Sequence, residues 1–300
     1  MTVRAPGSAT APSEARRGGD ADVRRALDLL AGRPLVVLTG AGLSTDSGIP
    51  DYRGPGAPAL TPMTYQEFVS GLPAQQRYWA RSHLGWGRMR GAEPNPGHRA
   101  LVALDPELLI TQNVDGLHER AGSRRVVALH GRISEVVCLA RREATPRAAL
   151  HVRMDELNPG WAQAHGAVET RPDGDVDLDD TAGFVVPACR TCGGVLKPDV
   201  VFFGENVPTP RVQRCFDAVD ALGGGGPGGG RPDGDAGAPG GGALLVVGSS
   251  LTVMSGLRFV RRAAKAGTPV VIANRGATRG DDLATCAVDV GCSEFLTALV

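Results

Sequence analysis

Gly40, Ala41 and Gly42 directly follow an apolar run and are the first residues whose types suit chemistry. Residues without bulk let backbone N–H groups and a helix N-terminus approach an anion, so this turn predicts a phosphate cradle. A dehydrogenase fingerprint would place a third glycine at position 45 and an acidic residue about 20 positions further on. Position 45 is Thr, and residues 53–65 contain neither Asp nor Glu. Hydride transfer is therefore disfavoured, while a turn without a ligand stays open for the triplet alone.

Asn113, Asp115 and His130 form a second group, because they follow further apolar runs. Short amide and carboxylate side chains hold sugar hydroxyls and amides in fixed directions. An imidazole, with a reference pKa of about 6.5, exchanges protons near neutral pH and suits a general base. A hydrogen-bonded core histidine is the structural alternative for His130.

Cys189 and Cys192, with two residues between them, form a third group. This C-x-x-C spacing suits two thiolate ligands of one zinc ion. The cysteines, at positions 138, 189, 192, 215, 286 and 292, are scattered in a way that suits a reducing compartment, with metal-binding or packing roles. We therefore expect no disulfides.

Five short runs rich in Val, Leu and Ile predict the buried parallel strands that position these groups. They cover residues 35–38, 108–110, 126–129, 244–247 and 270–273, with helical patterns between them, such as residues 22–30 and 256–266. This alternation predicts an α/β fold with a doubly wound, Rossmann-like parallel sheet. Each run opens into glycine or polar residues, and ligands of such sheets bind outside the carboxyl ends of the strands. The five turns should therefore meet at one site.

Interruptions of this alternation predict the domain organisation. We expect residues 21–56, 95–137 and 197–300 to form the large domain, and the insertions at residues 57–94 and 138–196 to form a smaller one. Residues 1–20 have no apolar core and are expected to be a disordered tail. Twelve of the twenty residues from 223 to 242 are Gly. Because chain entropy opposes packing of such a segment, it predicts a flexible surface loop.

The charge balance argues against nucleic acid as a partner. Lys plus Arg and Asp plus Glu each number 32, so no overall field favours a polyanion or an anionic membrane. The N-terminal residues show neither the apolar core of a secretion signal or membrane anchor nor an amphipathic transit pattern. We therefore expect a cytoplasmic protein without a membrane anchor, of open oligomeric state.

Four separated blocks together resemble the sirtuin family. The blocks are GAGLSTDSGIPDYR at residues 40–53, TQNVDGLH at 111–118, HG at 130–131 and GSSL at 248–251, in the family's order and spacing. Residues 196–205 and 276–283 look like the class II branch of the family. The resemblance extends from about residue 35 to residue 292, and it implies an NAD-consuming protein deacylase.

The resemblance also implies roles for individual residues. His130 and Asn113 would be catalytic: His130 would activate a ribose hydroxyl, and Asn113 would hold the ribose or an ordered water. Asp115 would accept a hydrogen bond from the nicotinamide carboxamide. For Cys292, a small buried side chain without cofactor contact is equally expected. The residues expected to contact NAD are Gly40, Ala41, Gly42, Ser44, Thr45, Ile49, Asp51, Tyr52, Arg53, Gln112, Asn113, Val114, Asp115, Gly248, Ser249, Ser250, Asn274, Arg275, Gly276 and Cys292.

The implied reaction is removal of an acyl group, such as acetyl, from lysine in a protein. NAD is consumed, and lysine, nicotinamide and O-acyl-ADP-ribose are produced. The acyl-lysine segment is expected to bind as an added strand between residues 201–205 and 253–256. Protein mono-ADP-ribosyl transfer in the same pocket is the alternative. A non-catalytic NAD sensor is a third possibility, disfavoured by the intact His130 and Asn113.

The zinc site that the resemblance implies is incomplete in this sequence. Sirtuins commonly hold a structural zinc with two C-x-x-C pairs in a zinc-ribbon-like module, and Arg141 stands where the second cysteine of the first pair is expected. A guanidinium cannot ligate zinc. The predicted ligands are therefore Cys138, Cys189 and Cys192. Glu143 or His151 could complete the shell, or packing could replace the metal.

Overall fold

The computed structural model describes residues 16–17, 19–52, 62–165, 178, 180–223 and 241–300. Arg53 and most of the expected tail and glycine-rich loop lie outside these residues. Within the expected tail, strand β1 (Arg16–Arg17) pairs with strand β10, and helix α1 begins at Asp20. Ordered structure therefore begins before residue 21.

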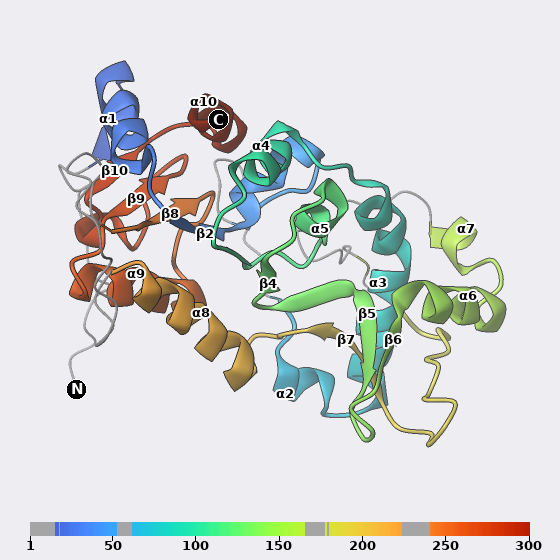
Figure 1. Ribbon diagram of the computed structural model, residues 1–300. Coiled ribbons are helices and arrows are strands. Elements are labelled where there is room, and N and C mark those ends of the chain that lie inside the picture. Colours follow the sequence, from blue (N-terminus) through green and yellow to red (C-terminus); the bar gives the residue numbers. More distant parts are fainter. Residues whose placement is uncertain (1–15, 18, 53–61, 166–177, 179, 224–240) are drawn as a thin grey trace, which may run out of the picture.

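In the described part of the chain, seven strands form a parallel sheet in the order β1-β10-β9-β8-β2-β3-β4 (Figure 1). The direction of winding changes between β2 and β8, which are neighbours in the sheet but far apart in sequence. This topology confirms the doubly wound prediction. Besides β1, the strands are β2 (Leu35–Thr39), β3 (Leu108–Thr111), β4 (Val126–Ala128), β8 (Ala243–Val247), β9 (Val270–Ala273) and β10 (Cys286–Val288).

Helices cover both faces of this sheet (Figure 1). Helices α1 (Asp20–Leu30), α4 (Pro96–Leu104) and α10 (Cys292–Leu299) pack on the face that includes Leu35 and Val37. Helices α8 (Thr209–Ala221) and α9 (Met254–Lys265) pack on the face that includes Val36 and Leu38. Successive side chains of a strand point to opposite faces, so strands buried on both faces become continuous apolar runs. No helix among the described residues has both the length and the apolar character of a membrane span.

Short elements follow the strands at the carboxyl edge of the sheet, where the predicted site lies. Two 3₁₀ turns, η1 (Ala41–Leu43) and η2 (Thr45–Ser47), follow β2. Helix α5 (Leu117–Ala121) follows β3, and the 3₁₀ turn η3 (Asp281–Leu283) follows β9.

A smaller module contains a second, antiparallel sheet in the order β6-β5-β7. Strand β5 begins at Gly131, directly after His130, and β7 ends at Val200, so this sheet extends beyond residues 138–196 on both sides. The small sheet therefore begins at the candidate catalytic histidine. The elements of the module are α2 (Tyr65–Phe68), α3 (Leu72–Gly91), β5 (Gly131–Cys138), β6 (Ala144–Pro146), α6 (Arg147–Leu157), α7 (Trp161–His165) and β7 (Leu196–Val200).

Aromatic side chains form the core of the small module. Trp79 is fully buried, and its Nε1 donates to the carbonyl oxygen of Leu196 at 3.1 Å, which ties α3 to β7. Phe68 packs edge-on against Phe202, with ring centroids 5.4 Å apart. Edge-to-face aromatic pairs of this kind add to the stabilisation that comes from burial alone.

Gly131 brings β5 against β7 at a point where a side chain has no room. Its φ is 83°, and a Cβ there would lie 1.9 Å from the carbonyl oxygen of Asp199. We expect Gly131→Ala to lower the free energy of unfolding by roughly 2–5 kcal/mol, because left-handed strain and overpacking add. Gly122→Ala is the matched control, since Gly122 has φ 104° but nothing within 4 Å of an added Cβ. Denaturant unfolding measures both variants; equal destabilisation would contradict the steric argument.

Candidate active site

A cavity of about 570 Å³ opens at the carboxyl edge of the large sheet. Its lining includes residues from the turns after β2, β3, β4, β8 and β9, so the five turns meet as the strand pattern predicts. This volume lies within the range of sites for small molecules, about 300–1,000 Å³.

Most of the residues expected at the site line this cavity, but two described residues do not. Thr45 is exposed outside the cavity lining, and its Oγ1 donates to the carbonyl oxygen of Gly42 at 2.9 Å. Cys292 is buried, with its Sγ 2.9 Å from where a Cβ on Gly248 would be. The expected residues that line the cavity are Gly40, Ala41, Gly42, Ser44, Ile49, Asp51, Tyr52, Gln112, Asn113, Val114, Asp115, His130, Gly248, Ser249, Ser250, Asn274, Arg275 and Gly276.

The glycine turns after β2 and β8 are in direct contact. The backbone N–H of Gly42 donates to the carbonyl oxygen of Gly248 at 2.9 Å. A Cβ on Gly40 would lie 2.7 Å from that oxygen and 2.8 Å from Cβ of Ser249. Glycine is therefore required at position 40 by the packing of the two turns, and the same lack of bulk leaves backbone groups open to the cavity.

Asn113, Ser44 and Asp115 form a hydrogen-bonded chain along the cavity wall. Asn113 Nδ2 donates to Ser44 Oγ and to the carbonyl oxygen of Gly40, both at 3.0 Å. Ser44 Oγ in turn donates to Asp115 Oδ2 at 2.7 Å. The backbone N–H of Leu117 donates to Asp115 Oδ1 at 2.9 Å. The turn after β3 is thereby held against the turn after β2.

Burial raises the pKa of Asp115, because desolvation disfavours the carboxylate. The hydrogen bonds from Leu117 and Ser44 act in the opposite direction and lower it. Asp115 is thus a half-buried acceptor whose partners are already in place.

His130 is held through both of its ring nitrogens. Nδ1 lies 2.9 Å from the carbonyl oxygen of Gln112, and Nε2 lies 2.8 Å from Oγ of Ser255. A carbonyl oxygen only accepts, so Nδ1 carries the proton of the neutral ring. Nε2 therefore presents its lone pair and accepts from the Ser255 hydroxyl. This is the tautomer that a general base on the cavity side requires.

The surroundings of His130 keep its ring neutral. Burial, together with the positive charges of Arg258 and Arg211, lowers the pKa of His130 to about 4. The hydrogen bond to the Gln112 carbonyl partly offsets these effects. The basic form of the imidazole is therefore present throughout the neutral range.

Side chains of two turns shape the remainder of the wall. Ser249 Oγ donates to Gln112 Oε1 at 2.6 Å and so links the turns after β8 and β3. Asn274 Nδ2 donates to the carbonyl oxygens of Arg275 and Gly276 and shapes the turn after β9.

Several lining residues were not identified as site residues from the sequence. Tyr78 and Met63 reach the cavity from the small module, and Arg258 reaches it from α9. A tyrosine in an aromatic-rich helix and an arginine in an amphipathic helix have ordinary packing and solvation roles. The docking of the small module on the sheet edge brings Tyr78 and Met63 to the site, and the packing of α9 on the large sheet brings Arg258.

Cys138, Cys189 and Cys192 are brought together in the small module. Their sulfur atoms lie within 4.8 Å of one another, and the Sγ atoms of Cys138 and Cys192 are 3.6 Å apart. Backbone N–H groups of Thr191 and Cys192 lower the pKa of the Cys189 thiol to about 7. Three converging thiols fit three of the four tetrahedral positions of zinc.

Neither of the two candidate fourth ligands joins this cluster. Glu143 makes a bidentate ion pair with Arg141, with distances of 2.9 and 2.6 Å. His151 belongs to a different cluster, with His83 and Asp155. The ion pair with Glu143 thus neutralises the charge of Arg141 beside the three thiols.

A family model described as "Sir2 family" matches residues 40–223. The chain belongs to the Sir2 family. The match covers the glycine turn, the Asn113–Asp115 segment, His130 and the cysteine cluster, which are the features assembled around the sheet edge and in the small module. The family thus agrees with the sirtuin resemblance of the sequence blocks.

Curated relatives match this sirtuin over nearly its whole length. A protein of Mycobacterium avium (strain 104) named "NAD-dependent protein deacetylase 1" is 48% identical over 288 residues, which covers 94% of this chain and 95% of the relative. A protein of the same name from Streptomyces coelicolor is 49% identical and covers 94% and 90%.

Solved sirtuin structures share the fold. One described as "The Structural basis for Sirtuin Substrate affinity" has a TM-score of 0.69 at 27% identity, covering 92% of this chain and 96% of that chain. Another, described as "Sir2-p53 peptide-NAD+", has a TM-score of 0.68 at 28% identity with the same coverage.

We expect Arg141→Cys to strengthen zinc binding, because it supplies a fourth thiolate at C-x-x-C spacing from Cys138. The thermal midpoint of unfolding should rise in the presence of zinc, since a ligand that binds only the folded chain stabilises it. Zinc retention against a chelator and thermal unfolding measure the two effects. Arg141→Ser is the control, because it removes the guanidinium without adding a ligand. Equal zinc retention in both variants would contradict the prediction.

Proposed function

We propose that this sirtuin is an NAD-dependent protein lysine deacetylase, in which the acyl group is transferred to ADP-ribose and nicotinamide is released. The observation that carries the proposal is the neutral His130 tautomer, whose Nε2 accepts from Ser255, with both residues lining a cavity that glycine turns bound. The curated relatives named as NAD-dependent protein deacetylases support the same activity. A solved Sir2 structure with a p53 peptide and NAD supports NAD and a protein segment as the two substrates.

The cavity fits a dinucleotide at its glycine-lined end. Gly40 and Gly42 follow β2, and Gly248 follows β8, so three positions without side chains surround one end of the cavity. Backbone N–H groups at such turns bind phosphate oxygens. Asn274 and Gly276, after β9, would contact the adenosine ribose, and Asn113 and Asp115 the nicotinamide riboside.

The residues of this chain would act mainly by positioning and proton transfer. The acyl-lysine carbonyl oxygen bonds to the ribosyl carbon as nicotinamide leaves, and a ribose hydroxyl then attacks the acyl carbon. His130 Nε2 accepts the proton of that hydroxyl, in place of the hydrogen bond that it accepts from Ser255 in the free protein. Water completes the release of lysine and O-acyl-ADP-ribose.

The acyl-lysine segment would bind between residues 201–205 and 253–256 as an added strand. Both segments contribute to the cavity lining. Phe203 and Met254, one on each side, are 42% and 41% exposed. Their apolar side chains would lie against the added strand.

We expect His130→Ala to reduce acyl-dependent nicotinamide release by roughly 10²–10⁴-fold, which is the usual contribution of a general base. Its affinity for NAD should change little, because the glycine turns are untouched. Mass spectrometry of reactions that contain purified protein, NAD and a panel of acyl-lysine peptides measures nicotinamide release. Calorimetry measures NAD binding. Full turnover by the variant would sink the assignment of the base.

The same experiment separates the alternatives. Mono-ADP-ribosyl transfer predicts a protein acceptor that gains the mass of ADP-ribose, without a requirement for the acyl group. A non-catalytic NAD sensor predicts binding of NAD without nicotinamide release by the wild-type protein.

We expect kcat/KM to stay near its neutral-pH value well below pH 6.5. The ratio reports ionisations of the free enzyme, and the basic form of His130 is lost only as the pH falls through its lowered pKa of about 4. Rates measured from pH 4 to 8 with an acetyl-lysine peptide locate the acidic limb of the profile. Circular dichroism in the same buffers checks that the protein stays folded. An acidic limb near 6.5 in a folded protein would contradict the lowered pKa.

A further inference from the structure

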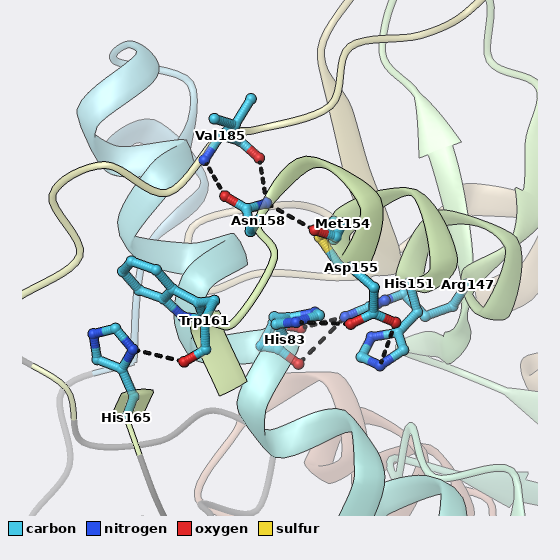
Figure 2. Close-up of polar contacts among 10 residues, drawn as sticks. His83, Arg147, His151, Met154, Asp155, Asn158, Trp161, His165 and Val185 are labelled. Carbon is cyan, nitrogen blue, oxygen red and sulfur yellow. Dashed lines mark hydrogen bonds and ion pairs between the residues drawn. The ribbon is translucent and has the colours of Figure 1, made fainter. Parts of the chain in front are cut away.

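A polar cluster lies between α3 and α6, apart from the cavity lining and the three cysteines. His83 of α3 faces His151 and Asp155 of α6 (Figure 2). Arg147, His151 and Asp155 are spaced by four residues, so they share one face of α6. Two imidazoles and a carboxylate thus converge where two helices pack.

The atoms of this cluster are separated by distances close to those of ligands around one metal ion. His83 Nε2 is 3.3 Å from Asp155 Oδ1, and His151 Nε2 is 3.8 Å from Asp155 Oδ2. One ligand atom from each residue lies within 4.8 Å of the other two. Tetrahedral zinc with bonds of about 2.1 Å separates its ligand atoms by roughly 3.4 Å. Small side-chain rotations would therefore close the set around an ion.

The two imidazoles are poorly provided with hydrogen-bond partners. Nδ1 of His83 and Nδ1 of His151 are buried and have no partner. The 3.8 Å separation of His151 Nε2 from Asp155 is too long for a hydrogen bond. Buried side-chain nitrogen atoms nearly always have a partner. An ion bound to the Nε2 atoms would give His151 Nε2 the close partner that Asp155 does not supply at 3.8 Å, whereas the two Nδ1 atoms would keep no partner.

Burial and accessibility both suit a bound ion. The ring of His83 is buried, and desolvation favours the neutral form in which an imidazole coordinates a metal ion. The side chain of His83 is 1% exposed, whereas that of Asp155 is 55% exposed. An ion from solvent would therefore enter at the carboxylate and reach the buried imidazoles.

Arg147 restricts the kind of cation. Its buried guanidinium lies over the rings of Trp79 and Trp86, at 5.3 and 5.0 Å, and donates to the carbonyl oxygen of Ser82. This fixed positive charge opposes ions that are held by charge and oxygen ligands, such as Ca²⁺ and Mg²⁺. Ions that bond strongly to imidazole nitrogen, such as Zn²⁺ and Co²⁺, suit the donor set.

We propose that His83, His151 and Asp155 bind a divalent transition-metal ion of the zinc class, which joins α3 to α6. This site is separate from the cysteine cluster and does not depend on the proposed deacetylase activity.

Cobalt titration of the full-length protein tests the proposal. We expect wild type to bind one more equivalent of Co²⁺ than Asp155→Asn or His151→Gln, with visible absorption that lacks thiolate-to-cobalt charge transfer. Absorption from the cysteine cluster carries that charge transfer and should be unchanged in both variants. Bound Co²⁺ should also quench tryptophan fluorescence, because the Trp86 ring lies 6.4 Å from that of His151. Ca²⁺ and Mg²⁺ should not compete.

Glu156→Gln is the matched control, since it removes one exposed carboxylate from the same helix outside the cluster. It should bind as much Co²⁺ as wild type. Equal cobalt stoichiometry in wild type, Asp155→Asn and His151→Gln would overturn the proposal. The cluster would then be only a polar contact between α3 and α6. Circular dichroism shows whether each variant is folded, and Asp155→Asn, the most exposed of the three positions, decides if His151→Gln unfolds.

Discussion

The hydrogen bond from Gly42 N–H to the carbonyl oxygen of Gly248, at 2.9 Å, is the contact on which the site depends. It joins the turns after β2 and β8, the two neighbouring strands between which the direction of winding changes. In α/β sheets this is the point where adjacent loops diverge and leave a crevice. Because a Cβ on Gly40 would approach the Gly248 oxygen to 2.7 Å, the crevice floor must be made of backbone.

The position of the proton acceptor follows from a second constraint, the junction of the two sheets. His130 lies between β4 of the large sheet and β5 of the small one. Its carbonyl oxygen accepts from the Val201 N–H at 2.8 Å, and its ring is held by Gln112 and Ser255. The large sheet supplies the Gln112 carbonyl, and α9 supplies the serine. The imidazole is thus oriented before any substrate binds, which is the condition for efficient proton transfer.

The small module combines an apolar core with polar clusters. Trp79 and Phe184 are almost completely buried in this core. Cys138, at the end of β5, belongs to this core, and Cys189 and Cys192 meet it from the loop that precedes β7. The ion pair of Arg141 with Glu143 lies where the fourth cysteine is expected. His83 and His151 form a separate polar contact, between α3 and α6.

The sequence by itself determined the five strands β2, β3, β4, β8 and β9 of the large sheet and the turns that follow them, whereas the short edge strands β1 and β10 carry no apolar run long enough to predict them. Continuous apolar runs such as residues 35–38 and the Gly-Ala-Gly triplet are local patterns, and sheet burial and tight turns impose them directly. Only the tertiary structure decided that Ser255 contacts His130, that Arg258 lines the cavity, and that His151 lies with His83 rather than with the cysteines. Each of these contacts joins residues from different elements, so it depends on how the helices and the two sheets pack. A local sequence pattern carries no information about that packing.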